Sequence, residues 1–418
     1  MDHHHRRRNR HFRNLSALTF LIFSYGVPAD TWPLERILGL LQDHSPSVAA
    51  AASRVQQADG AMMTARQYPN PEFETGGGAS SGLGSGSLSG YNAMAYLSQP
   101  LDLPFVREAR REVAEAGIVS AEHANKAVWQ IVQARTRQAF FDILRREAEL
   151  AIALDNQRLL EQIRDKVGLK VEVGEAARYE IVKADAELSN AVKLTAAATI
   201  QVEDAKSALR ALFAGALPRE FEIYGELPAT PETPPNLDKL RQSVLDKQPL
   251  LRQARAEVQR AEAQLNLEQQ QRYPVPTLKA GVEHDPGLEQ WRVGISLPLP
   301  LWNQRQGQIA EAQAGVRQSE AEASQTELAL IRELENAYNR YQLADRQVKT
   351  FESALLQQAE KALQVAEAAY RLGERGILDY LDAQRIFRSV RSDYQNARFD
   401  RINALIDLER LNGGELDS

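Results

Sequence analysis

The chain carries one pattern of residues twice, about two hundred positions apart. The first copy reads Gly174-Glu-Ala-Ala-Arg-Tyr-Glu-Ile-Val-Lys-Ala184 and the second Gly373-Glu-Arg-Gly-Ile-Leu-Asp-Tyr-Leu-Asp-Ala383. Glycine adopts positive φ at little cost, so Gly373 and Gly376 predict that one helix ends and another begins, with Asp379 in the first turn of the new helix. Both stretches therefore predict tips of helical hairpins, and the chain is a tandem duplication.

The composition favours long helices over an ordinary mixture of elements. The 418 residues are 43% hydrophobic and 25% charged, and only 7% are aromatic. Ala, Glu, Gln, Leu and Arg dominate, while most Pro and Gly residues fall in a few clusters. Such a chain is typical of long helices with short interruptions.

The first 29 residues predict a signal peptide. Five arginines precede an apolar run from Leu15 to Val27, and Val27-Pro28-Ala29 is a small-residue site of the kind that signal peptidase cleaves. Cleavage near Ala29 removes five of the 50 basic and one of the 56 acidic residues, which leaves 45 against 55 and a net charge near −10. This charge does not favour nucleic acid as a partner.

Two absences limit how the mature chain meets a membrane. The chain has no cysteine, which is compatible with an oxidising compartment and excludes a lipid anchor on an N-terminal cysteine. After the signal peptide, no apolar run reaches the ~18 residues that a membrane-spanning helix needs. Any crossing of a membrane is therefore expected to use β-strands.

Each half of the mature chain predicts the same order of elements. The first repeat, residues 30–213, contains a short helix, a β-hairpin at 72–98, a long helix at 105–167, a tip at 168–174 and a short helix at 175–213. The second repeat, residues 237–418, contains a short helix, a β-hairpin at 277–297, a long helix at 303–372, a tip at 373–376 and a short helix at 377–411. A Pro-rich linker or equatorial segment, 214–236, separates the repeats.

The predicted lengths imply a layer of rods. At ~1.5 Å per residue the two long helices would measure roughly 95 and 105 Å, and two short helices laid end to end match one long helix. The apolar residues of the second long helix keep a 4-then-3 spacing from Leu330 to Leu372, with a gap at Gln358. Four short strands cannot close a barrel alone, so we expect the chain to assemble with copies of itself.

At this point the chain resembles the TolC-like outer-membrane factor family, the exit ducts of Gram-negative efflux and type I secretion systems. The duplication, the paired hairpins and both Gly tips carry the resemblance over essentially the whole mature sequence. It resembles most the outer-membrane subunits of heavy-metal efflux systems of the cobalt-zinc-cadmium (CzcC-like) and nickel type. That narrower likeness lies in Gly294-Ile-Ser-Leu-Pro-Leu-Pro-Leu-Trp-Asn-Gln-Arg-Gln-Gly-Gln-Ile-Ala-Glu-Ala312 and Ser98-Gln-Pro-Leu-Asp102.

The resemblance implies a mainly α fold with transmembrane β. It implies a homotrimer in which four strands per chain form a twelve-stranded β-barrel in the outer membrane, continuous with a periplasmic α-helical barrel whose far end is gated. The implied partners are a periplasmic adaptor (membrane fusion) protein, an inner-membrane RND pump and outer-membrane lipid. The implied function is an exit channel for divalent heavy-metal cations such as cobalt, nickel, zinc or cadmium.

Asp379 and Asp382 are the candidate gate residues. They lie three apart and so share one helix face, and in a trimer they would form two rings of carboxylates that favour cations. The alternative is that both are solvated carboxylates near a helix N-terminus, which the helix dipole favours in any case. The spacing alone does not separate the two interpretations, and the resemblance favours the gate.

The resemblance also implies gate links. Tyr370 and Arg375 match the family's gate positions, and Glu180 takes the place of their acidic partner on the neighbouring hairpin. Tyr179 departs from the small polar residue found in the best-known member. The alternative is a set of exposed ion pairs worth under ~1 kcal/mol each, without effect on gating.

No metal site, cofactor or catalytic site is predicted. The run His3-His4-His5 and His11 lie within the predicted signal peptide, and after it only His44, His123 and His284 remain. None of these forms a pair with metal-ligand spacing, even together with Met62, Met63 and Met94. The chain has no nucleophile motif and no phosphate-binding Gly loop, so we do not expect an enzyme.

Two other functions stay open at this point. One is an outer-membrane channel of the same family that serves drug or solvent efflux or type I secretion. The other is a periplasmic coiled-coil adaptor, which would also have a signal peptide, long hairpins and β segments. Adaptors normally carry one helical hairpin within a lipoyl-like domain, whereas this chain predicts two, each after its own β-hairpin.

Overall fold

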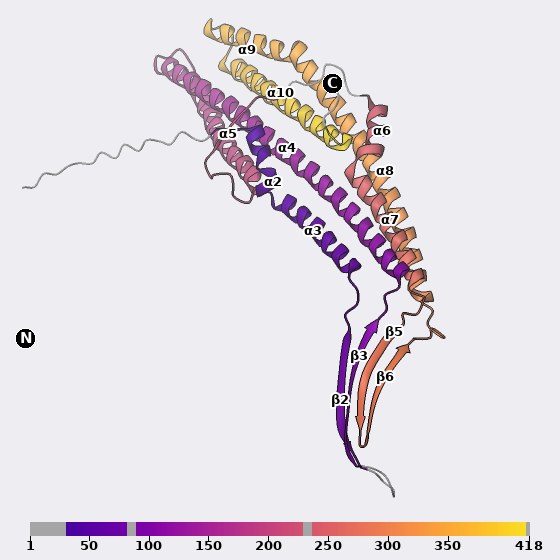
Figure 1. The fold of residues 1–418 in the computed structure, drawn as a ribbon. Helices are drawn as coiled ribbons and strands as arrows, with labels where there is room; N and C mark the ends of the chain where they lie inside the picture. The colour runs from indigo at the N-terminus through magenta and orange to yellow at the C-terminus, as the bar shows by residue number, and fades with distance from the viewer. Residues whose placement is uncertain (1–30, 82–88, 229–235, 415–418) are drawn as a thin grey trace, which may run out of the picture.

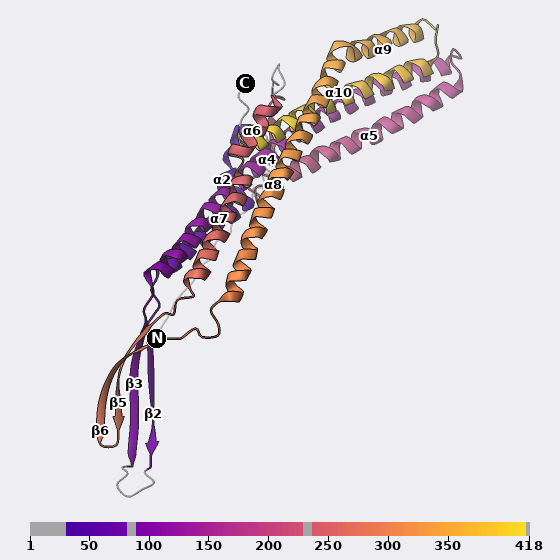
Figure 2. The same cartoon turned by 90° about the vertical axis from the view of Figure 1, so that its right-hand side faces the viewer.

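The computed structural model describes residues 31–81, 89–228 and 236–414. The predicted signal peptide, the new N-terminus at Asp30 and parts of the predicted first hairpin loop and linker lie outside these residues. The molecule is a long curved layer with a small sheet at one end and two helical tips at the other (Figure 1). Figure 2 shows the same layer from the side, with the helices running away from the sheet.

The elements of the first repeat keep the predicted order. They are β1 (Thr31–Pro33), α1 (Leu34–Gly39), α2 (Leu41–His44), α3 (Pro46–Arg66), β2 (Glu72–Ser80), β3 (Gly90–Pro100), α4 (Pro104–Glu172) and α5 (Arg178–Ala211). Pro46 begins α3, and Ser45 before it forms no side-chain cap hydrogen bond. The first helix region is therefore divided into three short helices.

The second repeat follows the same plan. The linker contains the short strand β4 (Glu222–Tyr224). The elements of the second repeat are α6 (Leu237–Lys247), α7 (Pro249–Gln270), β5 (Thr277–Asp285), β6 (Leu288–Ser296), α8 (Gln306–Thr350), the π-helix η1 (Phe351–Leu355), α9 (Leu356–Arg371) and α10 (Ile377–Asn412). Among the described residues, no helix has both the length and the apolar character needed to cross a membrane.

The main sheet joins the two repeats. Its strand order is β2-β3-β5-β6, and every pair is antiparallel. Glu72 lies opposite Ser98 in the first hairpin, and Thr277 lies opposite Ser296 in the second. In the central pair, β3 and β5, Pro100 lies opposite Thr277. The edge strands of the sheet are β2 and β6.

The sheet has one apolar and one polar face, because residues paired across strands point to the same side. The apolar face carries Phe73, Ala95, Leu97, Leu278, Ala280, Val282, Trp291, Val293 and Ile295. The opposite face carries Glu72, Glu74, Asn92, Tyr96, Lys279, Glu283 and Arg292. On that polar face Tyr96 donates a hydrogen bond to Glu283, which also pairs with Arg292 at 2.9 Å.

The helices form a single layer in which short helices flank long ones. Near the sheet, α4 contacts α3 on one side and α7 on the other, and α7 contacts α8. Toward the tips, α5 contacts α4, α4 contacts α10, and α10 contacts α9 (Figures 1 and 2). The long-plus-two-short plan of the sequence analysis is thus the plan of the structure.

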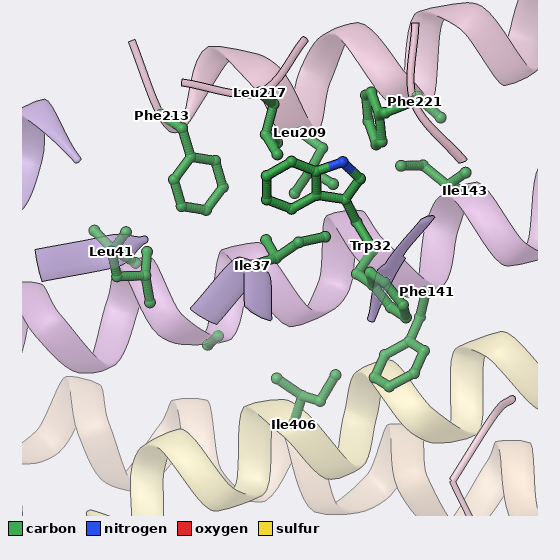
Figure 3. Close-up of a cluster of buried hydrophobic side chains, with 14 of the residues drawn as sticks. Trp32, Ile37, Leu41, Phe141, Ile143, Leu209, Phe213, Leu217, Phe221 and Ile406 are labelled. Carbon is green, nitrogen blue, oxygen red and sulfur yellow. The ribbon is translucent and has the colours of Figure 1, made fainter. Parts of the chain in front are cut away.

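An aromatic cluster holds the middle of the first repeat together. The parallel pair β1–β4 places Trp32 opposite Ile223, and the indole lies among Ile37, Leu209, Leu217 and Phe221 (Figure 3). The guanidinium of Arg36 lies 3.7 Å from the centre of the indole. Part of the predicted linker is therefore core, because Leu217 and Phe221, on either side of Pro218, are buried in this cluster.

The long helices depart from the prediction in two ways. Helix α4 continues through Gly168 to Glu172, since a single helical glycine costs only about 1 kcal/mol relative to alanine. The predicted tip at 168–174 therefore moves to the residues just after Glu172. The second long helix is interrupted by the π-helix η1, which the sequence analysis did not predict.

Candidate gate at the hairpin tips

The two tips have the same backbone hydrogen bonds. Gly174 has φ +78° and Gly373 has φ +74°. In the first tip the N–H of Glu175 donates to the carbonyl of Lys170 at 2.8 Å, and in the second the N–H of Glu374 donates to the carbonyl of Ala369 at 2.9 Å. A left-handed residue followed by this long backward hydrogen bond ends a helix in the Schellman manner. The duplication therefore extends to the geometry of the turn.

Gly376 lies at the start of α10 and has an extended backbone rather than positive φ. Its φ of −74° and ψ of 166° are extended, and it is the N-cap residue of α10. The matching residue of the first tip is Ala177, with φ −72° and ψ 142° as the N-cap of α5. In the second tip Gly373 alone has positive φ, because one left-handed residue is enough to reverse the chain.

Tyr370 is the centre of the packing between the two hairpins. Its side chain is only 9% exposed, and its ring stacks on that of Tyr380 with 5.9 Å between ring centres. The ammonium of Lys170, from the first hairpin, lies 4.7 Å from the centre of the Tyr370 ring. Around this pair lie the buried residues Leu160, Ile163, Val167, Ala191, Ile377 and Leu381. The ring therefore holds α4, α9 and α10 together.

The hydroxyl group of Tyr370 is buried without a hydrogen-bond partner among the described residues. Burial raises its pKa, and the negative charge of Glu180 raises it further. The hydroxyl is therefore protonated at neutral pH and able to donate. No Tyr370–Glu180 hydrogen bond forms within the described chain, although the charge of Glu180 acts on the phenol.

The charged gate residues of the second tip pair with residues three or four positions away in the sequence. The Nη1 of Arg375 lies 3.5 Å from the Oδ2 of Asp379, and Asp382 pairs with Arg385. All four side chains are exposed. The structure thus brings Arg375 to Asp379 rather than to Glu180, and it leaves both carboxylates accessible to solvent near the start of α10.

Two features of this region were missed in the sequence. Lys170 and Tyr380 both contact Tyr370, and burial raises the pKa of Tyr380 to about 12. The only available signal was a tyrosine on each side of the tip.

Exposed apolar side chains also line the outer edges of the layer, namely Val365 and Leu372 on α9 and Tyr179, Val182, Val192 and Ile200 on α5.

The described residues contain no group of three or more histidine, aspartate and glutamate side chains placed to hold a metal ion. His123 lies beside Lys126 and Arg252 in the middle of the layer, and its pKa is lowered by burial and by these two charges. A nearby positive charge opposes metal ligation, since a metal ion is itself a cation.

A family model described as outer membrane efflux protein matches two stretches of the chain, residues 37–215 and 240–414. Together they cover most of the chain, and each stretch matches one of the two repeats. This chain belongs to the outer membrane efflux protein family. It is therefore an outer-membrane efflux channel of the TolC type with a periplasmic helical extension, and a transporter rather than an enzyme.

Relatives of this efflux protein include two metal-resistance proteins. The cobalt-zinc-cadmium resistance protein CzcC of Cupriavidus metallidurans is 27% identical over 91% of this chain and 90% of its own length. The nickel-cobalt-cadmium resistance protein NccC of Alcaligenes xylosoxydans xylosoxydans is 27% identical over 66% of this chain and 63% of its own length. The predicted family resemblance is confirmed.

The solved structure of the Campylobacter jejuni CmeC outer membrane channel has the same fold. It superposes with a TM-score of 0.78 over 91% of this chain and 85% of that chain, at 16% sequence identity. The predicted fold, long helices with four strands per chain, is confirmed.

Proposed function

We propose that three copies of this chain form the exit channel of a tripartite RND-type efflux system that exports divalent heavy-metal cations such as cobalt, nickel, zinc and cadmium. The observation that carries the proposal is the sheet. Its strands have the nine to eleven residues that span a membrane when tilted. One face is apolar and suits lipid, and both edge strands are unpaired among the described residues.

The internal junction between the repeats predicts how copies join. Ser98 and Ser296 are equivalent, as are Glu72 and Thr277, because both hairpins pair these residues. The β3–β5 junction would then serve as the template for β6 against β2 of the next copy. Since Leu97 lies opposite Ala280, Ile295 should lie opposite Thr75 of the neighbouring copy.

This register keeps the apolar faces of the copies continuous, because Ile295 and Thr75 belong to the same face of the sheet. The template also includes a backbone hydrogen bond from Leu101 N–H to the carbonyl of Pro276, 2.8 Å long. Its equivalent between copies is Leu299 N–H to the carbonyl of Pro71.

Cysteine cross-linking tests the assembly directly, since the chain has no cysteine of its own. The variant with Ile295→Cys and Thr75→Cys should form disulfide-linked trimers in outer membranes, because directly opposed residues have Cβ atoms about 5 Å apart. The matched control, Ile295→Cys with Phe73→Cys, lies two residues out of register on the same face and should cross-link poorly. Equal cross-linking in both variants would contradict the register, and monomers in both would contradict the trimer.

The gate proposal rests on the tip geometry. In a trimer the exposed carboxylates Asp379 and Asp382 would form two rings of three charges, which favour cations over anions. Replacing both by asparagine should lower the cation-to-anion permeability ratio in planar bilayers. Asp165→Asn, an exposed carboxylate of α4 near the same end, is the control and should leave this ratio unchanged. An unchanged ratio in the double variant would contradict the gate.

Tyr370 and Arg375 are proposed to bind Glu180 on the neighbouring hairpin when the tips are closed. Two facts support this. The Tyr370 hydroxyl has no partner among the described residues, and Glu180 is near enough for its charge to raise the pKa of that hydroxyl. A periplasmic adaptor that displaces these bonds would release the tips toward the inner-membrane pump.

The proposed cargo, divalent metal cations, rests on the names of the two metal-resistance relatives. A strain without this gene should lose tolerance to cobalt, nickel, zinc or cadmium and keep its tolerance to drugs and solvents. The opposite pattern would favour drug or solvent efflux. Fractionation separates the remaining alternative, because the channel should be a heat-modifiable trimer in the outer membrane and an adaptor would be a soluble periplasmic protein.

A further inference from the structure

The second long helix contains a turn that the first one lacks. Residues Phe351–Leu355 form a π-helix, and the N–H of Leu356 donates to the carbonyl of Phe351, five residues back. Helix α4 is α-helical over all 69 of its residues. In both views the chain changes direction between α8 and α9 (Figures 1 and 2). A π-turn is one of the few identifiable causes of a sharp helix kink.

The π-turn moves the buried side of the helix by one residue. Up to Val348 the buried residues follow the 4-then-3 spacing. Beyond the turn the side chains packed inward are Ala359, Leu363, Ala366 and Tyr370, each one position after the continuation of that spacing. Val365 and Leu372, which continue the original spacing, are 69% and 75% exposed. The turn therefore accommodates one additional residue, and it rotates the buried face of α9 relative to the buried face of α8.

The same region is weakly packed. Every residue of the second hairpin is described, and none is buried between Val348 and Ala359 in the long helix or between Gln384 and Ala397 in α10. Helix α4 at the matching level keeps a buried residue in every turn, namely Ile152, Asn156 and Leu160. Helix α5 has a comparable stretch without buried residues, 192–201, so the difference between the hairpins lies in their long helices.

Tyr394 contacts the π-turn in this weakly packed region. The rings of Phe351 and Tyr394 lie 6.0 Å apart, and the hydroxyl of Tyr394 donates to the Oε1 of Glu352 at 2.9 Å. Both contacts join the π-turn to α10. On the sheet side of the π-turn lies the cluster with Leu334 and Leu408, and on the tip side lies the cluster with Tyr370 and Ile377. Within the second hairpin, two well-packed clusters are thus joined by a segment in which Tyr394 connects the π-turn to α10.

We propose that the π-turn at Phe351–Leu355 is a hinge between the sheet-side half and the tip half of the second hairpin, with the Tyr394–Glu352 hydrogen bond as its latch. Segments with few buried contacts open at low free-energy cost, and hinges concentrate the change of backbone angles in a few residues. Movement at this hinge would displace Asp379 and Asp382, and this consequence alone rests on the proposed gate.

Hydrogen exchange of the purified trimer tests the hinge without any channel activity. The amides of 351–359 should exchange at least about tenfold faster than those of 152–160, the matching stretch of α4 in the same molecule. Tyr394→Phe removes the latch and keeps the ring, so it should increase the exchange of 351–359 further. Equal exchange in the two stretches would overturn the hinge.

Deletion of Ser353 tests whether the additional residue is the cause. It should convert the π-turn to α-helix and keep the phase of α9, so Tyr370 stays buried while the fast exchange is lost. Ser353→Ala keeps the length of the turn and is the matched control. Unchanged exchange in the deletion variant would contradict the hinge.

Planar bilayers separate the hinge from the gate. With the hinge coupled to the gate, the deletion variant should open less often than the Ser353→Ala control at the same voltage. Slowed exchange with unchanged openings would overturn that coupling and leave the hinge in place. An absence of ion currents in the unmodified trimer would instead count against the proposed channel, whatever the exchange shows.

Discussion

The two hairpin tips share one backbone and differ in almost every side chain that faces their surroundings. Gly174 and Gly373 end their helices with the same φ and the same pair of backbone hydrogen bonds. The side chains, however, differ. The second tip has Tyr370, Arg375, Asp379 and Asp382, and the matched residues of the first tip are Val171, Ala176, Glu180 and Lys183. The comparison teaches that the duplication preserved the turn, which any hairpin needs, and placed the aromatic anchor and acidic pair in one copy only.

Removing the anchor should produce the largest difference between the tips. Tyr370→Ala deletes a buried ring and should cost roughly 3 kcal/mol or more of local stability, whereas Val171→Ala, at the matched half-buried position, should cost about 1 kcal/mol. Hydrogen exchange of the tip amides measures both losses. Tyr370→Phe should cost no more than about 1.5 kcal/mol, because it keeps the buried ring and removes only the hydroxyl, which has no partner among the described residues. Equal losses at the two tips would break the comparison.

The shared turn should respond alike in both copies. Gly373→Ala and Gly174→Ala each force a Cβ into the left-handed region and should destabilise their tip by about 1 to 2 kcal/mol. Gly376→Ala should cost at most about 1 kcal/mol, because alanine is a poorer N-cap than glycine but the backbone there is extended and no atom lies within 4 Å of the added Cβ. Exchange rates of the two tips in the three variants measure this, and a large loss for Gly376→Ala would contradict the assigned N-cap role.

Arg375→Ala gives the second tip the residue of the first. The ion pair with Asp379 is exposed, so its loss should cost under ~1 kcal/mol of stability. If Arg375 binds Glu180 in the closed trimer, the conductance of the closed state in a planar bilayer should nevertheless rise. Arg385→Ala, which removes the exposed pair of Asp382, is the matched control. A closed-state conductance that stays at the unmodified level would refute the proposed link.

The features set by backbone requirements were readable from the sequence. Left-handed turns need Gly174 and Gly373, strands facing two environments alternate as in Trp291 to Ile295, and prolines mark where helices start and stop. These signals are local, so they predicted the tips, the sheet and the two repeats. The candidate gate residues were reached through the family resemblance, and their roles remain proposals.

The features set by packing were not readable in the same way. In the sequence, the only trace of the π-turn is a weak break in apolar spacing near Gln358. The turn itself contacts Tyr394, which lies far along the chain, so no neighbouring residue announces it. The β1–β4 pair depends on Trp32 meeting residues far along the chain. Distant contacts decide such positions, and a spacing rule does not include them.

Alkaline pH should separate the tips by the smallest effect. Burial raises the pKa of both Tyr370 and Tyr380 above their ordinary value, the latter to about 12. A group whose pKa is raised by folding adds stability below its unfolded pKa, near 10 for tyrosine, and loses it as the pH rises through the folded value. The second tip should therefore loosen between about pH 10 and 12, while the first tip, with valine and isoleucine at the matched positions, should change less. A mobility-sensitive label on Leu372→Cys, compared with one on the matched and equally exposed Val173→Cys, measures this, and simultaneous loosening at both labels would show that the tyrosine pair does not set the alkaline limit.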